Sequence, residues 1–313
     1  MDMNMTRRKA LMTAGLTPTL ALATPALLTL TESAGAQTPA PGQPRLSHGF
    51  KLGDFTVTTL MAGRRESPHP QGTFGTNASP EEFAKLSEEN FIPHDRTMNG
   101  FTPVLVQTGA EVVLFDTGLS PEGILPALAE AGVGPEDVTL VVLTHMHGDH
   151  IGGLSGASGP TFAKARYVTG AIEYDHWAKA GNEGFDKHVK PLAEKMTMLD
   201  DGGSAAAGIT AHLAPGHTPG HMVYSLESGG KRLMITADTA NHYVWSLARP
   251  DWEVRFDMDK AKAAESRRKV FGEIAAERIP FIGYHMPHPA VGFVAREGDG
   301  FRYVPASYQF LLE

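Results

Sequence analysis

Four side chains that can bind a metal lie within six residues of one another, at His145, His147, Asp149 and His150. They directly follow the apolar run 138–143, which predicts a buried strand. A strand that ends in such a loop can bring imidazole and carboxylate groups into one small volume, and both groups bind zinc and related divalent ions. The sequence therefore predicts a fold in which the end of a strand delivers a metal site.

Three further polar side chains also directly follow a strand-like run: His217 follows 210–216, Asp238 follows 234–237 and His285 follows 281–284. Strand ends that converge on one edge of a layered sheet are where such folds place their sites. Seven nitrogen and oxygen ligands exceed the four of a tetrahedral zinc site, but they suit two metal ions that share a bridging ligand.

The composition narrows the chemistry. The 313 residues are 42% hydrophobic, which is enough for the core of one or two domains. The chain has no cysteine, so disulfides, thiolate nucleophiles and cysteine-bound metals are excluded. A formal net charge of −8 disfavours nucleic acid as a partner and leaves small molecules as the expected substrates.

The N-terminal residues have the pattern of an export signal. The paired arginines Arg7 and Arg8 precede a moderately apolar stretch, 10–30, and small residues follow at 34–36. This pattern predicts a twin-arginine signal peptide over residues 1–36 and a periplasmic or secreted protein. Two prolines interrupt the apolar stretch, so no stable membrane span is expected after cleavage.

A Pro-rich tether is expected at 37–45, followed by a single catalytic domain over 46–313. Helices are predicted from a cap at Ser79, from Ser120 to about Ala131, and over 258–278. Strands are predicted at 55–61, 104–106, 112–115, 138–143, 167–168, 209–213, 222–226, 233–236 and 279–284. Mixed strands with a few long helices indicate an α/β fold of the layered, α+β kind.

The order of the seven polar residues resembles that of the metallo-β-lactamase superfamily of hydrolases. The motif reads His145-x-His147-x-Asp149-His150, with His217, Asp238 and His285 following, and the segments 116–118 and 215–221 also match. The resemblance covers essentially the whole chain after the predicted signal segment. It implies an αβ/βα sandwich of two mixed β-sheets flanked by helices, with the site at one edge.

The resemblance also implies two ligand sets joined by one carboxylate: His145, His147 and His217 for one ion, Asp149, His150 and His285 for the other, and Asp238 between them. The cofactors would be two divalent ions, zinc foremost, with manganese, cobalt or iron as alternatives. Asp149 and Asp238 would orient a hydroxide that bridges the ions. Asp116 is expected to hold a ligand histidine by its other ring nitrogen.

Within the superfamily, the chain is most similar to the methyl parathion hydrolase-like and lactonase-like branch, on the segments 53–55, 256–259, 283–289 and 297–305. That branch hydrolyses phosphotriesters, aryl esters and lactones, and its members make a homodimer a reasonable expectation. The chain departs from the branch at 287–289, where Pro-His-Pro replaces a Phe-Pro-Gly run. The predicted activity is therefore ester or lactone hydrolysis, with phosphotriester hydrolysis as a secondary capacity.

Three alternatives stay open. A β-lactamase-type amide hydrolase is disfavoured because its familiar subclass needs a cysteine ligand and others lack an aspartate where Asp238 stands. A diiron redox enzyme of the same fold is disfavoured, because it has a glutamate in place of a ligand histidine and this chain has His147. A mononuclear iron oxygenase of the same fold stays open. Purely structural metals are disfavoured because closed structural sites use four tight ligands.

Four aromatic side chains are candidates for lining an apolar substrate cleft, with core packing as the alternative: Trp177, Phe185, Tyr243 and Trp245. Three other histidines are assigned to the structure or to the support of the ligands: His212, His221 and His288.

Overall fold

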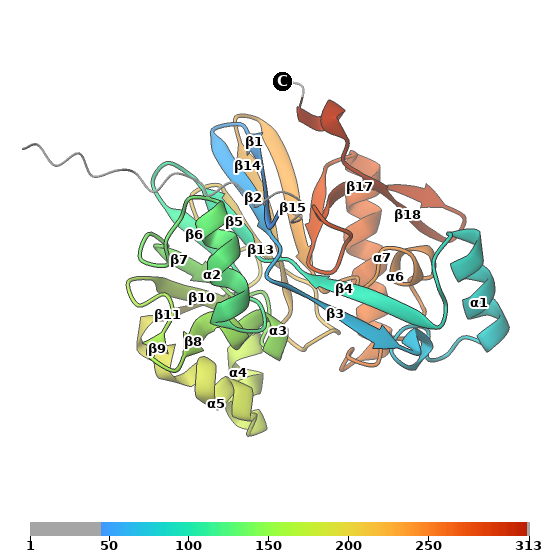
Figure 1. Cartoon of the computed structure of the whole chain (residues 1–313), viewed down its shortest axis with the longest axis horizontal. Helices are drawn as coiled ribbons and strands as arrows, with labels where there is room; N and C mark the ends of the chain where they lie inside the picture. Colours follow the sequence, from blue (N-terminus) through green and yellow to red (C-terminus); the bar gives the residue numbers. More distant parts are fainter. Residues whose placement is uncertain (1–44, 312–313) are drawn as a thin grey trace, which may run out of the picture. The chain divides into compact units, whose positions relative to one another are not determined.

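Two mixed seven-stranded β-sheets form the framework of residues 45–311, the part of the chain that this computed structural model describes (Figure 1). These residues fall within one compact unit. The predicted signal peptide and all but the last residue of the predicted tether lie outside the described residues. Within 45–311, no helix combines the length and the apolar character that crossing a membrane requires.

The first sheet has the order β1-β2-β5-β6-β7-β10-β11. Its strands are β1 (Ser47–Leu52), β2 (Phe55–Leu60), β5 (Val104–Gln107), β6 (Val112–Phe115), β7 (Leu140–Val142), β10 (Arg166–Gly170) and β11 (Met196–Leu199). The last four strands of this sheet run parallel to one another. Since parallel strands end at the same edge, the loops that follow β6 and β7 come together there.

The second sheet has the order β12-β13-β14-β15-β16-β17-β18. Its strands are β12 (Ser204–Ala206), β13 (Ile209–Leu213), β14 (Met222–Ser228), β15 (Lys231–Ala237), β16 (Phe281–Gly283), β17 (Val291–Glu297) and β18 (Gly300–Pro305). Only β15 and β16 pair in parallel, and the other neighbours are antiparallel. The loops after β15 and β16 carry Asp238 and His285, so this pairing places the two side chains at one edge.

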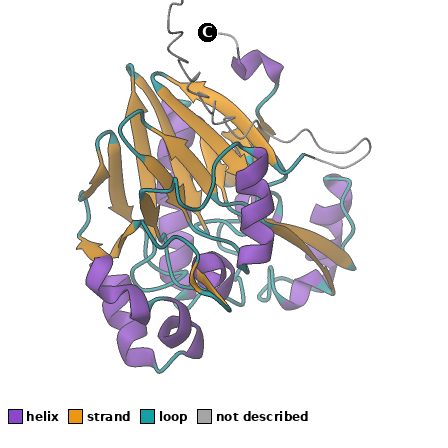
Figure 2. Cartoon of the chain, turned by 60° about the vertical axis from the view of Figure 1, so that its left-hand side comes forward, coloured by secondary structure: helices purple, strands orange, loops and turns teal. Residues whose placement is uncertain are grey.

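Apolar side chains from both sheets interdigitate to form the central core. Val57 and Val113 of the first sheet are fully buried in the same cluster as Ile209 and Leu233 of the second. Each such side chain contributes about 1.5–3 kcal/mol by leaving water. The two sheets are therefore joined face to face, as the αβ/βα sandwich requires, and Figure 2 shows helices outside them.

A second core covers the outer face of the first sheet. Leu114 and Val141 pack there with side chains of the helices α2 (Pro121–Glu130), α4 (Ala171–Ala180) and α5 (Glu183–His188). Strands β6 and β7 are thus buried on both faces, which explains why their sequences are continuous apolar runs rather than alternating ones.

The remaining helices are α1 (Pro80–Glu89), α3 (Gly148–Ile151), α6 (Trp245–Ala248) and α7 (Lys260–Glu277), with short 3₁₀ turns η1 (Pro70–Gly72), η2 (Gly152–Leu154), η3 (Lys190–Lys195) and η4 (Tyr308–Leu311). The cap predicted for α1 is present, because the Ser79 hydroxyl accepts the Glu82 N–H and the Glu82 carboxylate accepts the Ser79 N–H. Helix α7 packs on β17 of the second sheet.

A separate two-stranded antiparallel sheet of β3 (Gly63–Pro68) and β4 (Arg96–Phe101) was not predicted. We call it the hairpin, although helix α1 lies between its strands in the sequence. Its sequences, GRRESP and RTMNGF, are polar and lack the apolar alternation of a half-buried strand. The hairpin lies outside the two large sheets and extends towards α1 (Figure 1). A second short pair, β8 (Ser155–Gly156) and β9 (Gly159–Pro160), follows η2.

Candidate metal centre

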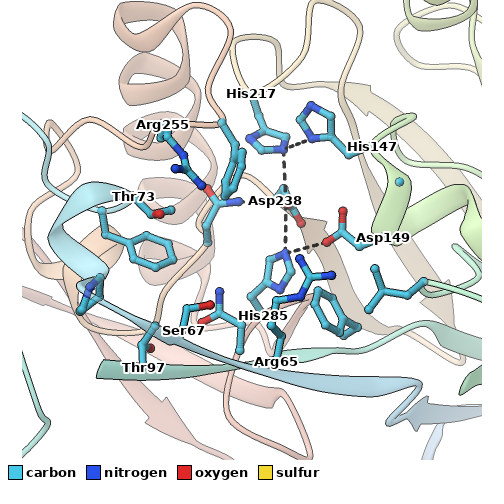
Figure 3. A pocket seen from close by; sticks show the side chains of 18 of the residues that line it. Arg65, Ser67, Thr73, Thr97, His147, Asp149, His217, Asp238, Arg255 and His285 are labelled. Atoms are coloured by element: carbon cyan, nitrogen blue, oxygen red, sulfur yellow. Dashed lines mark hydrogen bonds and ion pairs between the residues drawn. The ribbon is translucent and has the colours of Figure 1, made fainter. Parts of the chain in front are cut away.

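All seven predicted ligands meet at one edge of the sandwich. Four come from the segment after β7: His145 and His147 lie in the loop before α3, and Asp149 and His150 lie in α3 itself. His217, Asp238 and His285 arrive from the loops after β13, β15 and β16. Figure 3 shows His147, His217, Asp238, Asp149 and His285 pointing towards one another. Their role as ligands stays a prediction, but their convergence is a fact of the fold.

The first ligand set gathers three imidazole nitrogens. His147 Nδ1 lies 3.1 Å from His145 Nε2 and 2.9 Å from His217 Nε2. Donors of a tetrahedral zinc site lie about 3.3 Å apart when Zn–N bonds are about 2.0–2.1 Å long. Burial lowers the pKa of His147 to about 3 and also lowers the pKa of His145. Both rings are therefore neutral and present lone pairs, which is the form that binds a metal.

The second set gathers Asp149, His150 and His285. Asp149 Oδ2 lies 3.8 Å from His150 Nε2 and 3.5 Å from His285 Nε2. Asp238 stands between the two sets. Its Oδ1 lies 3.2 Å from His150 Nε2, and its Oδ2 lies 3.3 Å from His217 Nε2 and 3.2 Å from His285 Nε2. One carboxylate thus reaches donors of both sets, as a bridging ligand must.

Two buried atoms show that these residues fit a metal. His150 Nε2 and Asp238 Oδ1 lie 3.2 Å apart, but within residues 45–311 neither makes a well-formed hydrogen bond, although polar atoms this deep are normally paired. Burial opposes the charged form of His150, but the Asp116, Asp238 and Asp149 carboxylates outweigh it and raise its pKa well above the ordinary value. These carboxylates therefore favour positive charge at this position, which a proton or a metal ion supplies. A divalent ion between these donors would satisfy both orphaned atoms and the carboxylate charge.

Outer hydrogen bonds fix the orientation of the ligand rings. His150 Nδ1 donates to Asp116 Oδ2 at 2.8 Å, which is the contact predicted for Asp116. His217 Nδ1 donates to Asp257 Oδ1 at 2.9 Å, and His285 Nδ1 donates to the Gly100 carbonyl at 2.9 Å. Each contact turns the opposite ring nitrogen towards the centre and raises its basicity.

The backbone is strained at two strand ends beside the centre. Asp116, just after β6, and Ala237, at the end of β15, have φ values of 58° and 42°. Non-glycine residues rarely adopt this left-handed conformation, and it is concentrated at functional sites. At Asp116 it allows the carboxylate to accept both the Thr144 N–H and the Thr144 hydroxyl. At Ala237 it turns the chain so that the next residue, Asp238, faces the ligands.

Glu173 is a supporting residue that sequence reasoning missed. It is fully buried in the first turn of α4 and accepts four hydrogen bonds. Two come from the ligand loops, from Met146 N at 3.0 Å and Gly220 N at 2.9 Å, and two come from the Trp177 indole and the Thr218 hydroxyl. Burial raises its pKa although these bonds favour the charged form. Glu173 thus ties the His145–His147 loop to the His217 loop.

Gly220 is needed for that contact. A side chain there would place its Cβ only 2.1 Å from the Glu173 backbone nitrogen, so the two loops could not approach so closely.

Two more side chains support the centre. His221 Nε2 accepts the Asp238 N–H at 3.1 Å, and burial lowers the pKa of His221 to about 3. The Tyr284 ring stacks on His150 with centroids 3.9 Å apart, and its hydroxyl donates to the Asp149 carbonyl. The His212 ring bonds Ser225 on the neighbouring strand, and the exposed His288 lines a separate cavity. The supporting and structural roles assigned to these histidines agree with these contacts.

The centre forms the floor of a cavity of about 510 Å³. The structure corrects the expected cleft lining. Trp177 and Phe185 are buried in the outer core and do not line this cavity, although the Trp177 ring meets the His147 ring edge-on at 5.7 Å. Tyr243 and Trp245 line smaller cavities beside it. Trp177 and Phe185 therefore serve packing, whereas the aromatic residues that line this cavity are Phe74, Phe101 and Phe256.

The walls of the cavity come instead from the unpredicted hairpin and from the segment before α7. They include Arg65 and Ser67 of β3, Thr97 and Asn99 of β4, and the segment residues Arg255 and Phe256. Figure 3 shows these walls facing the ligand side chains. The sequence did not predict these wall residues, because isolated polar residues on two short polar strands form no recognisable motif.

The two-sheet fold and the gathered histidine and aspartate side chains define a sandwich protein with a candidate metal centre. A family model described as the metallo-beta-lactamase superfamily matches residues 102–280. The chain belongs to the metallo-beta-lactamase superfamily. The predicted superfamily and the predicted sandwich fold are therefore confirmed.

Known proteins agree with this assignment. The probable metallo-hydrolase YybB of Bacillus subtilis (strain 168) is 32% identical over 126 residues, which are 38% of this chain and 53% of YybB. The chain thus spans about half the length of that curated relative. The dizinc quorum-quenching lactonase AidC is similar with a TM-score of 0.77 and 27% identity, over 84% of this chain and 99% of AidC.

The hydrolase AbOPH of the beta lactamase superfamily has a TM-score of 0.78 and 22% identity, over 85% of this chain and 99% of its own. At that identity the likeness shows the fold alone. The finer placement of this chain beside methyl parathion hydrolases stays a prediction.

Proposed function

We propose that this protein hydrolyses ester or lactone bonds with two divalent metal ions, most simply two zinc ions, and that phosphotriesters are secondary substrates. The observation that carries the proposal is the position of Asp238. Its two carboxylate oxygens lie 3.2–3.3 Å from donors of both ligand sets, which favours two connected sites over a single one. The likeness to the dizinc lactonase AidC supports the same reading.

In this proposal His145, His147 and His217 hold one ion, Asp149, His150 and His285 hold the other, and Asp238 bridges them. When bound, such a pair of ions polarises a carbonyl or phosphoryl oxygen and makes hydroxide available near neutral pH. The protein needs no serine or cysteine nucleophile for this chemistry.

The two aspartates have different parts in handling the attacking water. The Asp238 side chain is only 4% exposed and is fixed by Asn241 Nδ2, which donates to Oδ2 at 2.9 Å. We assign it to orienting the nucleophile. The Asp149 side chain is 22% exposed and lines the cavity, so water that enters from solvent reaches it first. We assign Asp149 to orienting that water and accepting its proton.

The cavity suits a small substrate. Its volume of about 510 Å³ lies in the range of small-molecule sites, about 300–1,000 Å³. The buried ligand cluster at its floor excludes bulk water on the protein side, which strengthens electrostatic stabilisation of the developing anion.

The test is metal analysis of the purified protein together with a panel of aryl esters, lactones, phosphotriesters and a chromogenic β-lactam. The proposal expects two metals per chain and hydrolysis of esters or lactones that a chelator abolishes and added zinc restores. Turnover of the β-lactam alone would assign the protein to amide hydrolysis. A single iron with oxygen consumption would assign it to the oxygenases.

We further propose that the protein is exported by the twin-arginine route, on the pattern around Arg7 and Arg8, and that it forms a homodimer. Export is tested by the N-terminus of protein recovered from the periplasm, which should begin near Gln37. An intact Met1 on cytoplasmic protein would contradict it. Light scattering tests the dimer, which a monomer mass would contradict.

A further inference from the structure

Two arginines line the cavity without a carboxylate partner. Arg65 projects from β3, and Arg255 projects from the segment before α7. Both are exposed, and within residues 45–311 neither makes an ion pair or a side-chain hydrogen bond. Five other arginines of the described chain do form ion pairs: Arg166, Arg232, Arg267, Arg268 and Arg302. The cavity therefore holds two cationic groups whose donors face solvent.

Aromatic rings position both guanidinium groups. The Arg65 guanidinium carbon lies 5.8 Å from the centre of the Phe101 ring, and that ring meets His285 edge-on at 5.6 Å. The Arg255 guanidinium carbon lies 4.8 Å from the centre of the Phe256 ring. A guanidinium over an aromatic face is oriented by the ring, yet its N–H groups at the edge stay available for a ligand.

Figure 3 shows the two groups on different walls. Arg65 lies beside His285 and Asp149, whereas Arg255 lies across the cavity beside Thr73. A substrate whose scissile bond meets the ligand cluster would therefore have a cationic group on either side of it.

The charges that line the cavity oppose those of the whole chain. The chain has a formal net charge of −8. The only acidic residues that line this cavity within the described chain are Asp149 and Asp238, and both belong to the predicted ligand set. With those two committed to cations, the remaining charge on the walls is positive. Such a cavity attracts anionic substrates and repels cationic ones.

We propose that Arg65 and Arg255 make the enzyme selective for esters or lactones that carry a free carboxylate away from the scissile bond. A planar guanidinium matches a carboxylate with two parallel hydrogen bonds, which a neutral acyl chain cannot accept. The proposal rests on the proposed function, because it assumes hydrolysis at the ligand cluster. Arg65 and Arg255 are specificity residues in it and take no part in the bond cleavage.

The test uses two matched esters and the purified, metal-containing protein. Mono-p-nitrophenyl adipate carries a terminal carboxylate, and p-nitrophenyl hexanoate has an acyl chain of the same length without it. Each takes up one water and releases p-nitrophenol, so one absorbance reports both. The wild type should hydrolyse the adipate half-ester with a kcat/KM about 10-fold or more above that of the hexanoate, the effect of one charge-assisted contact.

Three substitutions assign the effect. The single variants R65Q and R255Q should each lower kcat/KM for the adipate half-ester, and the double variant should remove the preference, whereas hexanoate turnover stays near the wild-type value. R64Q is the matched control, because Arg64 is the preceding residue of β3 but lines a separate cavity. It should keep the full preference. Added salt should lower adipate turnover only, since screening weakens steering of the anion.

The proposal would be overturned by equal kcat/KM values for the two esters in the wild type. An equal fall in kcat/KM for both esters in R65Q/R255Q would also overturn it, and either result would leave ester hydrolysis intact. If neither ester is hydrolysed, the proposed function fails for esters, and calorimetric binding of monomethyl adipate decides the inference separately. Binding that weakens about 10-fold or more in R65Q/R255Q supports it. Equal binding by wild type and variant overturns it.

Discussion

The floor of the cavity and its walls are built in different ways. At the floor, His150 is fully buried between Asp116 and the stacked ring of Tyr284. On the walls, Arg65 and Arg255 are exposed and held only by contacts with aromatic rings. The floor is therefore fixed by the fold, whereas the walls can change without disturbing it. This separation predicts that substitutions at the walls change substrate preference and leave the ligand cluster intact.

The two regions touch at a few points, which include the Phe101–His285 ring contact, the His217–Asp257 hydrogen bond and one bond to the hairpin backbone. Gly100, on strand β4 of the hairpin, accepts the bond from His285 Nδ1. The hairpin thus supplies cavity walls on its side chains and one ligand support on its backbone. Because a backbone carbonyl is available whatever the side chain, the wall residues stay free to vary.

The largest effect is expected when a floor ligand is removed. His147→Ala should lower the metal content from about two to about one per chain, because the first site keeps only two imidazoles. Hydrolysis should fall below detection. Metal analysis and an ester assay measure both effects, with His212→Ala as the control that keeps its metals. If H147A kept two metals and full activity, the floor would not be the catalytic centre.

Glu173→Ala comes next. It leaves the Met146 and Gly220 N–H groups buried without an acceptor, at about 1–3 kcal/mol each. The free energy of unfolding should fall by about 3 kcal/mol or more, and affinity for the first ion should fall about 10–100-fold. Denaturant unfolding and metal competition measure these effects. Loss of stability with unchanged metal affinity would limit Glu173 to packing.

Asp257→Asn tests the outer support of His217. An amide is a poorer acceptor for the His217 N–H and leaves the buried Arg267, 3.0 Å away, without its counter-charge. Affinity for the first ion should fall about 10–100-fold. Asp259→Asn is the matched control, because Asp259 caps α7 two residues away and does not contact a ligand. Similar metal affinities in D257N and D259N would show that the His217–Asp257 bond does not tune the centre.

The smallest effect on the framework is expected at the walls. Arg65→Gln should leave the metal content unchanged and shift the free energy of unfolding by no more than about 0.5 kcal/mol, as for other exposed positions. Thermal unfolding and metal analysis check this. Loss of metal in R65Q would show that walls and floor are one cooperative unit and not two independent regions.

The residues of the floor could be predicted from the sequence, because each follows an apolar strand run and together they have the spacing of a known motif. The loop after β7 and the single side chains after β13, β15 and β16 could be placed from periodicity and motif order. Glu173 was missed because one acid in a helix start looks like an ordinary surface residue. Only its burial against two loops, from positions 27 and 47 residues away, reveals its role.

The walls were missed for a different reason. The hairpin strands β3 and β4 pair across a gap that contains α1, and their polar sequences carry no strand pattern. The aromatic residues predicted to line the cleft were inferred from residue type alone. Trp177 and Phe185 instead pack in the outer core, and Tyr243 and Trp245 line smaller cavities. Placement of this kind depends on tertiary packing, which residue spacing does not encode.

The most direct test of the central claim is an anomalous diffraction map of crystals of protein purified without chelator. A two-metal centre predicts two peaks per chain, one among His145, His147 and His217 and one among Asp149, His150 and His285, with the Asp238 carboxylate between them. A single peak, or none at these residues, would contradict a two-metal centre.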